Sequence, residues 1–165
     1  MTPKLGAPQP LIAAHALGEF ESGEASLDTW LQRRALANQA SGASRTFVVT
    51  DKDGRVFGYY AMAAGAVAHQ MATTGVRRNM PDPIPVMVLG RLAVDRRVQG
   101  VKLGAAMLQD AVFRAVTVSQ NAGVRALLVH ALHDRAKAFY EHYGFQESPG
   151  HPLTLMLRLS PPAGP

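Results

Sequence analysis

Two periodicities of apolar residues run along the chain and predict its helices and strands. In three segments, apolar and small residues recur every three to four positions, which is the spacing of an amphipathic helix. Other segments are alternating or continuously apolar and rich in β-branched residues, as strands are. The predicted helices span residues 26–39, 104–120 and 134–142. The predicted strands span residues 11–14, 45–50, 56–67, 86–94, 124–132 and 153–159.

The order of these segments predicts an α/β fold with a mixed sheet. Residues 51–54 (DKDG) supply a turn, so the strands on either side of it are expected to form an antiparallel hairpin. Residues 69–85 carry three prolines and predict a loop with at most a short turn of helix. In the second half, strand–helix–strand connections indicate parallel pairing. The ends, residues 1–10 and 160–165, are rich in Pro, Gly and Ala and are expected to be flexible.

Composition indicates one soluble domain. The chain has 165 residues, of which 47% are hydrophobic and 18% charged, and this suffices for one domain with a sizeable core. The absence of cysteine excludes disulfides, thiolate catalysis and cysteine metal sites. The longest apolar run, residues 59–68, is too short to span a bilayer, and no signal-peptide pattern opens the chain. We therefore expect a cytoplasmic protein that does not enter a membrane.

The charge balance is positive but leaves the partner open. The formal net charge is +5 and the pI is near 10.0, which favours polyanionic partners such as nucleic acid, or acidic cofactors. A cation-rich solvated surface without a partner would give the same balance. The six histidines are scattered without metal-ligand spacing, so we expect no metal.

A glycine-punctuated turn between the strand at 86–94 and the helix at 104–120 is a candidate phosphate site. Its sequence over residues 99–104 is QGVKLG. A strand that runs into such a turn and then a helix N-terminus presents unpaired backbone N–H groups and the positive end of the helix dipole, which suit a pyrophosphate. Arg96, Arg97 and Lys102 add positive charge. The Walker and GxGxxG fingerprints are absent, and an ordinary strand–helix turn with two glycines is the alternative.

Residues 99–104 resemble the acetyl-CoA loop of GNAT acetyltransferases, Arg/Gln-Gly-x-Gly-x-Gly/Ala after a strand. Lys102 stands where the family usually has glycine, and a side chain there is tolerable only if φ is negative or the chain shifts slightly. Residues 133–145 (HDRAKAFYEHYGF) are similar to the family's Asn-x-x-Ala…Phe-Tyr-x-x-x-Gly-Phe segment, with His133 in place of Asn. The resemblance implies a single-domain GNAT fold over residues 1–165, in which a mixed, mostly antiparallel sheet with splayed parallel central strands is flanked by helices.

The same resemblance implies a set of residues that contact acetyl-CoA. They come from the end of the strand, the turn, the first turn of the helix and the second motif. The residues are Leu92, Ala93, Val94, Arg97, Val98, Gln99, Gly100, Val101, Lys102, Leu103, Gly104, Ala105 and His133.

Tyr140 matches the family's usual general acid. A tyrosine has an ordinary pKa of about 10, so it is protonated at neutral pH and can donate to a thiolate. The backbone N–H groups of residues 92–94 are the expected donors to the thioester carbonyl and the pantetheine arm. From the residues alone, Tyr140 is equally an aromatic packing residue, as Phe139 and Phe145 are expected to be. Tyr143 is expected to be structural.

The pattern of acidic residues bears on the acceptor. No carboxylate stands out as a general base. A lysine amine, with a pKa of about 10.4, needs a base, whereas an α-amine near 8 is already partly neutral, and one beside an ester is lower still. The aminoacyl end of a charged tRNA is such a group.

Several further segments resemble the GNAT toxins of bacterial toxin–antitoxin pairs, the TacT-like group. These are residues 20–23 (FESG), 27–31 (LDTWL), 33–46 and 85–95, and the resemblance runs from about residue 11 to residue 159. It implies acetylation of the α-amine of aminoacyl-tRNA, which arrests translation. It also implies a ribbon-helix-helix antitoxin that blocks the toxin and represses the shared operon DNA, and a homodimer.

Arginines are the candidate contacts to tRNA phosphates. Arg77 and Arg78 lie in the polar loop, and Arg33, Arg34 and Arg45 lie in the N-terminal half. Arg91 lies inside an apolar strand, so it needs a carboxylate or a ligand phosphate as partner.

Two other functions remain open from the sequence. One is a GNAT enzyme that acts on a small amine or a protein N-terminus, with an incidental basic surface. The other is a binding module without catalysis, in which Lys102 and His133 mark a decayed cofactor site.

Overall fold

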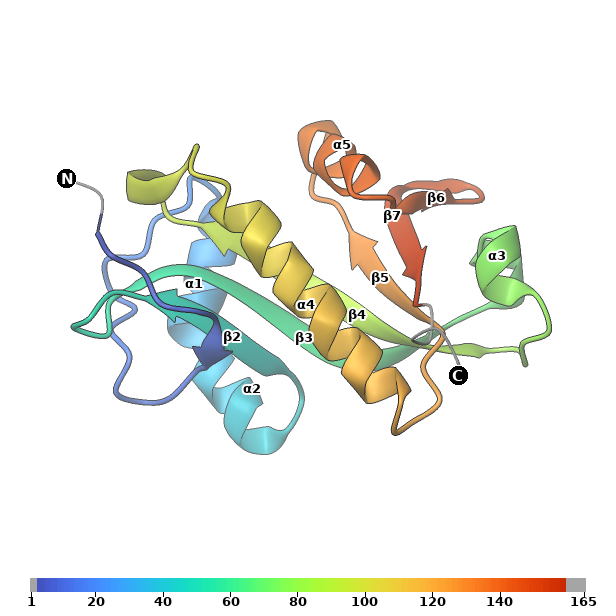
Figure 1. The fold of residues 1–165 in the computed structure, drawn as a ribbon, viewed down its shortest axis with the longest axis horizontal. Helices are drawn as coiled ribbons and strands as arrows, with labels where there is room; N and C mark the ends of the chain where they lie inside the picture. The colour runs from blue at the N-terminus through green and yellow to red at the C-terminus, as the bar shows by residue number, and fades with distance from the viewer. Residues whose placement is uncertain (1–2, 160–165) are drawn as a thin grey trace, which may run out of the picture. The chain divides into compact units, whose positions relative to one another are not determined.

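The computed structural model describes residues 3–159 as a sheet with helices around it (Figure 1). The strands form one seven-stranded sheet in the order β1-β2-β3-β4-β5-β7-β6. The strands are β1 (Gln9–Pro10), β2 (Arg45–Thr50), β3 (Val56–Val67), β4 (Ile84–Val94), β5 (Ala126–His130), β6 (Gln146–Ser148) and β7 (His151–Arg158). The helices are α1 (Ala25–Arg33), α2 (Ala35–Ser41), α3 (Thr74–Arg77), α4 (Leu103–Ser119) and α5 (Asp134–His142), with single 3-10 turns η1 (His69–Met71) and η2 (Arg96–Val98).

Strand pairing confirms a mixed, mostly antiparallel sheet. β2 pairs antiparallel with β1 and with β3, and β7 pairs antiparallel with β5 and with β6. The parallel pair is β4 with β5, from Val86 opposite Ala126 to Leu89 opposite Val129. This parallel ladder is only four residues long, although β4 continues to Val94.

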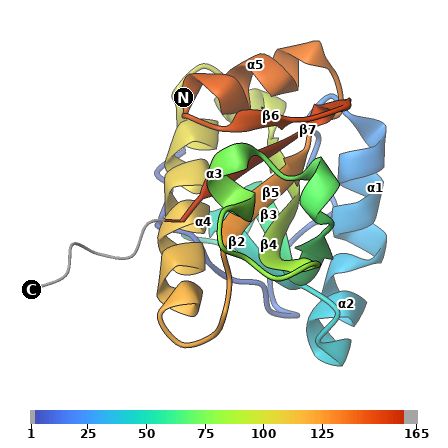
Figure 2. The ribbon, with the colours of Figure 1, turned by 90° about the vertical axis from the view of Figure 1, so that its right-hand side faces the viewer.

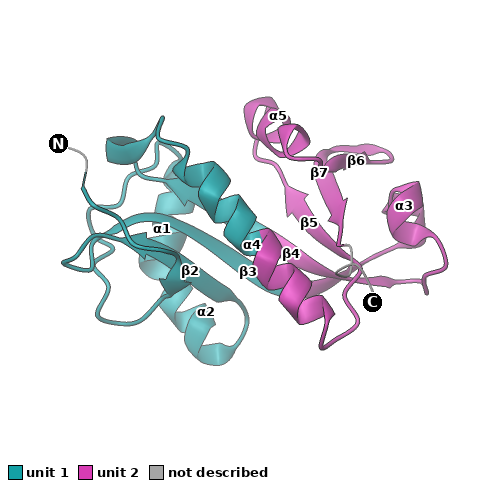
Figure 3. Ribbon diagram, viewed as in Figure 1, with its two compact units in different colours: residues 1–63, 90–111 teal, residues 64–89, 112–165 magenta. Residues whose placement is uncertain are grey.

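The chain divides into two compact units (Figure 3). Unit 1 comprises residues 1–63 and 90–111, and unit 2 comprises residues 64–89 and 112–165. The boundary within β4 falls directly after Leu89, where the parallel ladder with β5 ends.

Unit 1 has helices on both faces of its strands (Figure 2). Neighbouring residues of a strand point to opposite faces, and β3 shows this with two tyrosines. The hydroxyl of Tyr59 donates to the carbonyl oxygen of Leu27 on α1, at 2.6 Å. The hydroxyl of Tyr60 donates to the carboxylate of Asp110 on α4. Gly58 leaves room for α4, because a Cβ there would lie 3.0 Å from the Cε of Met107.

The core of unit 1 on the α1 side is aromatic. The ring of Trp30 stacks on Tyr59 at a centroid distance of 6.0 Å, and Phe20 meets Tyr59 edge-on at 5.5 Å. Leu31 and Ala35, on α1 and α2, are fully buried in the same cluster, which therefore fixes both helices on the sheet. Unit 2 has a separate aliphatic core, in which α3 and η1 pack on strands β4, β5 and β7. Its buried members are Val67, Ala72, Val76, Ile84, Val86, Ala126, Leu128 and Met156.

The structure differs from the predictions in several places. β7 follows β5 through α5 but pairs antiparallel with it, so the parallel pairing expected for this strand–helix–strand connection is wrong. β4 and β7 each begin two residues earlier than predicted, and β5 is limited to Ala126–His130. The first strand is Gln9–Pro10 rather than residues 11–14, so two residues of the expected flexible end pair with β2. The helix predicted over 26–39 is interrupted at Arg34, whose φ of −121° is not helical. The proline-rich loop carries short helical turns, η1 and the four-residue α3, in agreement with the expected turn of helix, whereas the short strand β6 was not predicted. Residues 1–2 and 160–165 lie outside the described residues.

Candidate active site

The predicted pyrophosphate turn lies in unit 1 between β4 and α4. After η2, the backbone passes through Gly100 with a φ of 87° and Lys102 with a φ of 64°, and α4 begins at Leu103. The amide of Ala106 donates to the carbonyl oxygen of Lys102 at 3.1 Å. The N–H groups that precede Ala106 in the first turn have no acceptor within a helix. These N–H groups form the positive end of the helix dipole, so the turn provides the donors that an anion needs.

Lys102 adopts a backbone conformation that glycine favours and that residues with a side chain rarely adopt. Of the two alternatives expected for a side chain here, a negative φ or a slight shift of the chain, the negative φ is excluded, because φ is 64° and lies in the left-handed region. A non-glycine residue in that region costs about 1–2 kcal/mol. The backbone at Lys102 therefore has a conformation that glycine would adopt at a lower energetic cost.

The side chain of Gln99 ties the turn to two other segments of unit 1. Its Nε2 donates to the carbonyl oxygen of Val94 at 3.0 Å, at the end of β4. The same atom donates to the carbonyl oxygen of Ser22 at 2.9 Å, in the segment that precedes α1. Ser22 in turn donates from its hydroxyl to Asp28 on α1, at 2.6 Å. Gln99 therefore fixes the turn through its side chain. Its predicted contact with the cofactor would have to come from its backbone N–H.

Asp95 is the central acceptor at the start of η2 and was missed in the sequence. Its side chain is almost fully buried and accepts hydrogen bonds from the backbone N–H groups of Glu21 and Arg97, both at 2.9 Å. The guanidinium of Arg97 adds two more, from Nε at 2.8 Å and from Nη2 at 3.0 Å. Burial by itself would raise the pKa of Asp95, but the hydrogen bonds from Arg97 and Glu21 outweigh it and lower the pKa.

Arg97 is held by protein groups on several sides. Besides Asp95, it lies 3.6 Å from the carboxylate of Glu19, and its guanidinium carbon lies 4.3 Å from the ring centroid of Phe57. Hydrogen bonding to Asp95 raises the pKa of Arg97 above its ordinary value. The neighbouring Arg96 pairs with Glu21 at 3.2 Å. These arginines therefore join the turn to residues 19–21, a role that the expected cofactor contact did not include.

Arg91, on β4, has a different partner from the one expected. Its guanidinium carbon lies 4.4 Å from the ring centroid of Trp30, in a cation–π contact. The carboxylate or phosphate that we expected is therefore not needed to explain an arginine in this strand. Ala93, two residues further along, is buried in the same aromatic core, whereas Leu92 and Val94 are partly exposed.

Tyr140 is a buried residue of α5 in unit 2. It is 7% exposed, and its ring contacts Phe139 at 5.3 Å and Phe145 at 5.5 Å between centroids. Burial raises the pKa of Tyr140 to about 12. The hydroxyl is therefore protonated throughout the physiological pH range, as a proton donor must be.

His133 caps the helix that carries Tyr140. Its Nδ1 accepts a hydrogen bond from the N–H of Ala136 at 3.1 Å, which is the role that Asn, Asp and Ser fill at helix N-termini. At the other end, Gly144 has a φ of 94° and the N–H of Phe145 donates to the carbonyl oxygen of Tyr140. The replacement of Asn by His therefore preserves the start of α5.

The two arginines predicted to bind tRNA lie at the end of α3, in unit 2. Arg77 is its last residue, Arg78 follows it, and both are exposed. Within residues 3–159, neither forms an ion pair. Arg125, which we did not predict, holds this end of α3 by donating to the carbonyl oxygens of Val76, Gly75 and Arg78 at 3.0–3.2 Å. Burial and the nearby charge of Arg158 lower the pKa of Arg125.

Sequence reasoning missed Asp95 and Arg125 for a common reason. Each binds the backbone of a segment that is distant in sequence, Glu21 for Asp95 and the end of α3 for Arg125. The local periodicity of apolar residues does not indicate such contacts. Asp95 nevertheless had a signal, because an aspartate that directly follows a strand and precedes two arginines is a typical start of a turn. The signal for Arg125 was weaker: it is a charged residue directly before a buried strand, which gives no indication of its partner.

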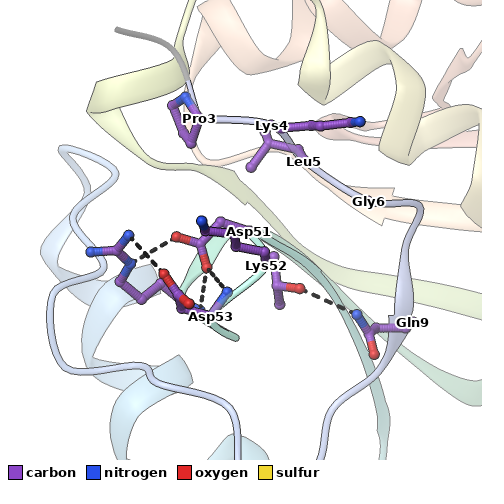
Figure 4. Close-up of a pocket in the computed structure, with 10 residues that line it drawn as sticks. Pro3, Lys4, Leu5, Gly6, Gln9, Asp51, Lys52 and Asp53 are labelled. Atoms are coloured by element: carbon purple, nitrogen blue, oxygen red, sulfur yellow. Dashed lines mark hydrogen bonds and ion pairs between the residues drawn. The ribbon is translucent and has the colours of Figure 1, made fainter.

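A surface pocket of about 1060 Å³ lies elsewhere in unit 1, at the β2–β3 turn (Figure 4). The N-terminal segment from Pro3 to Gly6 forms one side of it. On the other side, Asp51 accepts hydrogen bonds from Asp53 and Arg55, and Gln9 donates to Thr50. None of the residues predicted for the active site lines this pocket. Among the described residues, no group of three His, Asp or Glu side chains is placed to hold a metal ion. No described helix is long and apolar enough to cross a membrane.

Comparison with known proteins gives the family. The sequence profile of the GNAT acetyltransferase domain matches residues 43–147, which include both the turn and Tyr140. The chain therefore belongs to the GNAT family of acetyltransferases. Within this family, it is 56% identical over 151 residues to a tRNA-acetylating toxin of Mycobacterium tuberculosis (strain ATCC 25618 / H37Rv), across 92% of this chain and 90% of that protein.

Solved structures of one toxin, AtaT, share the fold. AtaT complexed with acetyl-methionyl-tRNAfMet has a TM-score of 0.87 at 25% identity, over 94% of this chain and 95% of that chain. AtaTR bound with AcCoA has a TM-score of 0.82 at 26% identity, over 94% of both chains. The AtaT–AtaR complex bound to DNA has a TM-score of 0.76 at 26% identity, over 93% and 94%.

Proposed function

We propose that this chain is a toxin that transfers the acetyl group of acetyl-CoA to the α-amino group of aminoacyl-tRNA and so blocks translation. The observation that carries the proposal is the 56% identity, over nine-tenths of both chains, with a toxin described as tRNA-acetylating. The glycine-like turn before α4 and the buried, protonated Tyr140 are consistent with acetyl transfer.

The turn fits a pyrophosphate. A Cβ at Gly100 would meet no atom within 4 Å, so the backbone at this point is open. We assign the diphosphate of acetyl-CoA to the backbone N–H groups of residues 99–105, with Lys102 as an additional cation. Backbone groups of residues 92–94 are assigned to the arm of the cofactor. Arg97, Val98 and His133 are assigned to positioning, because Arg97 and His133 already have protein partners and Val98 is buried.

Tyr140 is assigned as the proton donor at the sulfur. Bound acetyl-CoA supplies an acetyl group activated as a thioester. The phenol, with a pKa of about 12, keeps its proton until the acceptor nitrogen gives one up. In the overall transfer, the nitrogen gains the acetyl group and loses a proton, and the sulfur gains a proton. Tyr140 thus donates at the sulfur without a net change in its own protonation.

The acceptor is assigned from acid–base chemistry and charge. An α-amine beside an ester carbonyl has a lower pKa than an ordinary α-amine, so more of it is neutral at pH 7 and it needs less help from a base than a lysine does. Arg77 and Arg78 present two exposed cations at the end of α3, and phosphates of tRNA are their proposed partners. Arg91 stays among the proposed phosphate contacts, because its contact with Trp30 uses one face of the guanidinium and not the N–H donors in its plane.

The proposed partners follow from the relatives. AtaT has been solved with its partner AtaR on DNA, and we propose that this chain likewise has an antitoxin, of the ribbon-helix-helix type, which represses their shared operon. We further propose a homodimer that acts in the cytoplasm, where charged tRNA is found.

Incubation with labelled acetyl-CoA and a pool of charged tRNAs tests the proposal. Label is expected on aminoacyl-tRNA, with deacylated tRNA as the control that remains unlabelled. Label on a small amine or a protein N-terminus, with none on any charged tRNA, would show a different GNAT enzyme. Failure to bind acetyl-CoA in calorimetry would show a decayed cofactor site.

A further inference from the structure

Four rings of α5 and its end form a continuous series that runs from the buried Tyr140 to the surface. Tyr140 meets Phe139 edge-on at 5.3 Å, and Phe139 meets Tyr143 edge-on, also at 5.3 Å. Tyr143 then meets His142 at 4.8 Å with the two planes perpendicular. Phe139 and Tyr143 are four residues apart, so they share one face of the helix. Two ring contacts therefore lead from the proposed proton donor, Tyr140, to the exposed ring of Tyr143.

Exposure rises along this series. Tyr140 is 7% exposed, Phe139 is partly buried, and Tyr143 is 44% exposed. A single exposed apolar side chain needs no explanation. Here, however, the exposed ring continues a cluster that begins at the ring of Tyr140, the proposed proton donor. An exposed aromatic ring in that position is available to stack against a ligand.

The chemistry of the acceptor restricts what lies next to the reacting amine. In aminoacyl-tRNA, the amino acid is esterified to the last ribose of a single-stranded end, and the same ribose carries the last base. Proteins recognise unpaired RNA bases chiefly by stacking them on aromatic side chains. A base attached this close to the reacting nitrogen must lie near Tyr140, and the rings of Phe139 and Tyr143 are the aromatic surface that leads outward from it.

We propose that Tyr143, supported by Phe139, stacks against the 3′-terminal base of the acceptor RNA and thereby holds the aminoacyl ester at Tyr140. This inference rests on the proposed function and adds the group that recognises the RNA end. The edge-on contacts from Phe139 and His142 set the orientation of the Tyr143 ring and leave almost half of its side chain accessible to a base.

The Tyr143→Leu variant tests the proposed stacking of the terminal base on Tyr143, because it removes the ring and keeps an apolar side chain. The KM for charged tRNA is expected to rise about ten-fold or more, with kcat and the KM for acetyl-CoA unchanged. Tyr143→Trp is expected to keep or lower the KM for tRNA, since a larger ring still stacks. Phe113→Leu is the matched control, because Phe113 is 70% exposed in the same unit but lies on α4. It should leave both KM values unchanged.

Two further measurements separate the alternatives. Fluorescence anisotropy with an RNA oligonucleotide that ends in CCA reports binding without acetyl transfer, and Tyr143→Leu is expected to weaken it while Phe113→Leu does not. If the wild-type protein bound this RNA through Tyr143 but acetylated no charged tRNA, the proposed function would be overturned. The proposed stacking of the RNA base on Tyr143 would still hold. A rise in the KM for acetyl-CoA alone would instead assign the rings to the adenine of the cofactor. No change in any of these quantities would make Tyr143 a structural residue.

Discussion

Arg97 holds the buried carboxylate of Asp95 by two side-chain hydrogen bonds, from Nε at 2.8 Å and from Nη2 at 3.0 Å. This pair lies where β4 ends and the predicted pyrophosphate turn begins. The backbone N–H of Glu21 donates to the same carboxylate. Charge-assisted, two-point contacts of this kind are among the stronger hydrogen bonds in proteins. The pair therefore fixes the entrance to the turn.

We predict that Asp95→Asn lowers the free energy of unfolding by about 2 kcal/mol at pH 7, because hydrogen bonds to a charged group are lost. Since the pKa of Asp95 is lowered in the folded protein, its contribution is present above the ordinary pKa of about 3.9 and is lost as pH falls below that value. Urea unfolding from pH 7 to pH 3 checks both statements. If the wild-type and variant proteins lost stability equally in acid, the ionised pair would have no such role.

Lys102→Gly is expected to raise the free energy of unfolding by up to about 1 kcal/mol, because glycine adopts a φ of 64° without strain. Lys102→Ala keeps the strain and is expected to give no gain. Gly100→Ala serves as the reverse control, since its φ is 87° and a Cβ there has open space. It should destabilise the protein by about 1–2 kcal/mol through the backbone alone. Denaturant unfolding of the three variants measures these differences, and an equal gain from Lys102→Ala would exclude the backbone as the cause.

Tyr140→Phe is expected to reduce acetyl transfer by about 10²- to 10⁴-fold, the usual contribution of a positioned proton donor. Binding of acetyl-CoA, measured by calorimetry, should be retained. With a pKa of about 12, ionisation of Tyr140 should cause no loss of wild-type activity as pH rises from 7 to about 10. Near-normal turnover of the variant would remove Tyr140 from the reaction.

Replacing Arg77 and Arg78 together by alanine is expected to weaken tRNA binding, and most strongly at low salt. Removing two phosphate contacts should reduce the slope of log affinity against log salt by about 1.4–1.8. The double variant Lys4→Ala with Lys52→Ala is the control, because it removes the same charge from the pocket at the β2–β3 turn. An equal loss of affinity in both double variants would indicate a general effect of net charge.

Much of the fold could be predicted, because the hydrophobic pattern determines the larger elements. α4 and α5 lie within one residue of their predicted bounds, and β2 and β3 lie at theirs. The break at Arg34 was not visible, because the apolar spacing that buries Leu31 and Ala35 on one core is compatible with a continuous helix. β6 is three residues long and pairs with its neighbour β7, which is too short a segment to show a periodicity.

The site was predictable in its motifs and less so in its side-chain partners. The turn and Tyr140 were found because residues 99–104 and 133–145 resemble family segments. The partner of Arg91 was not, because Trp30 lies 61 positions earlier in the chain and approaches Arg91 only after the sheet has formed. Positive φ at Lys102 was likewise unexpected, since residue type alone favours a negative value there.

The double hydrogen bond of the Gln99 amide has a thermodynamic consequence for the cofactor. Because Nε2 joins the carbonyl oxygens of Val94 and Ser22, the turn loses its conformational freedom when the protein folds. For the proposed binding of acetyl-CoA at this turn, we therefore expect little cost in affinity from ordering the segment. If the turn binds the diphosphate as proposed, these two hydrogen bonds hold it in place before the cofactor arrives.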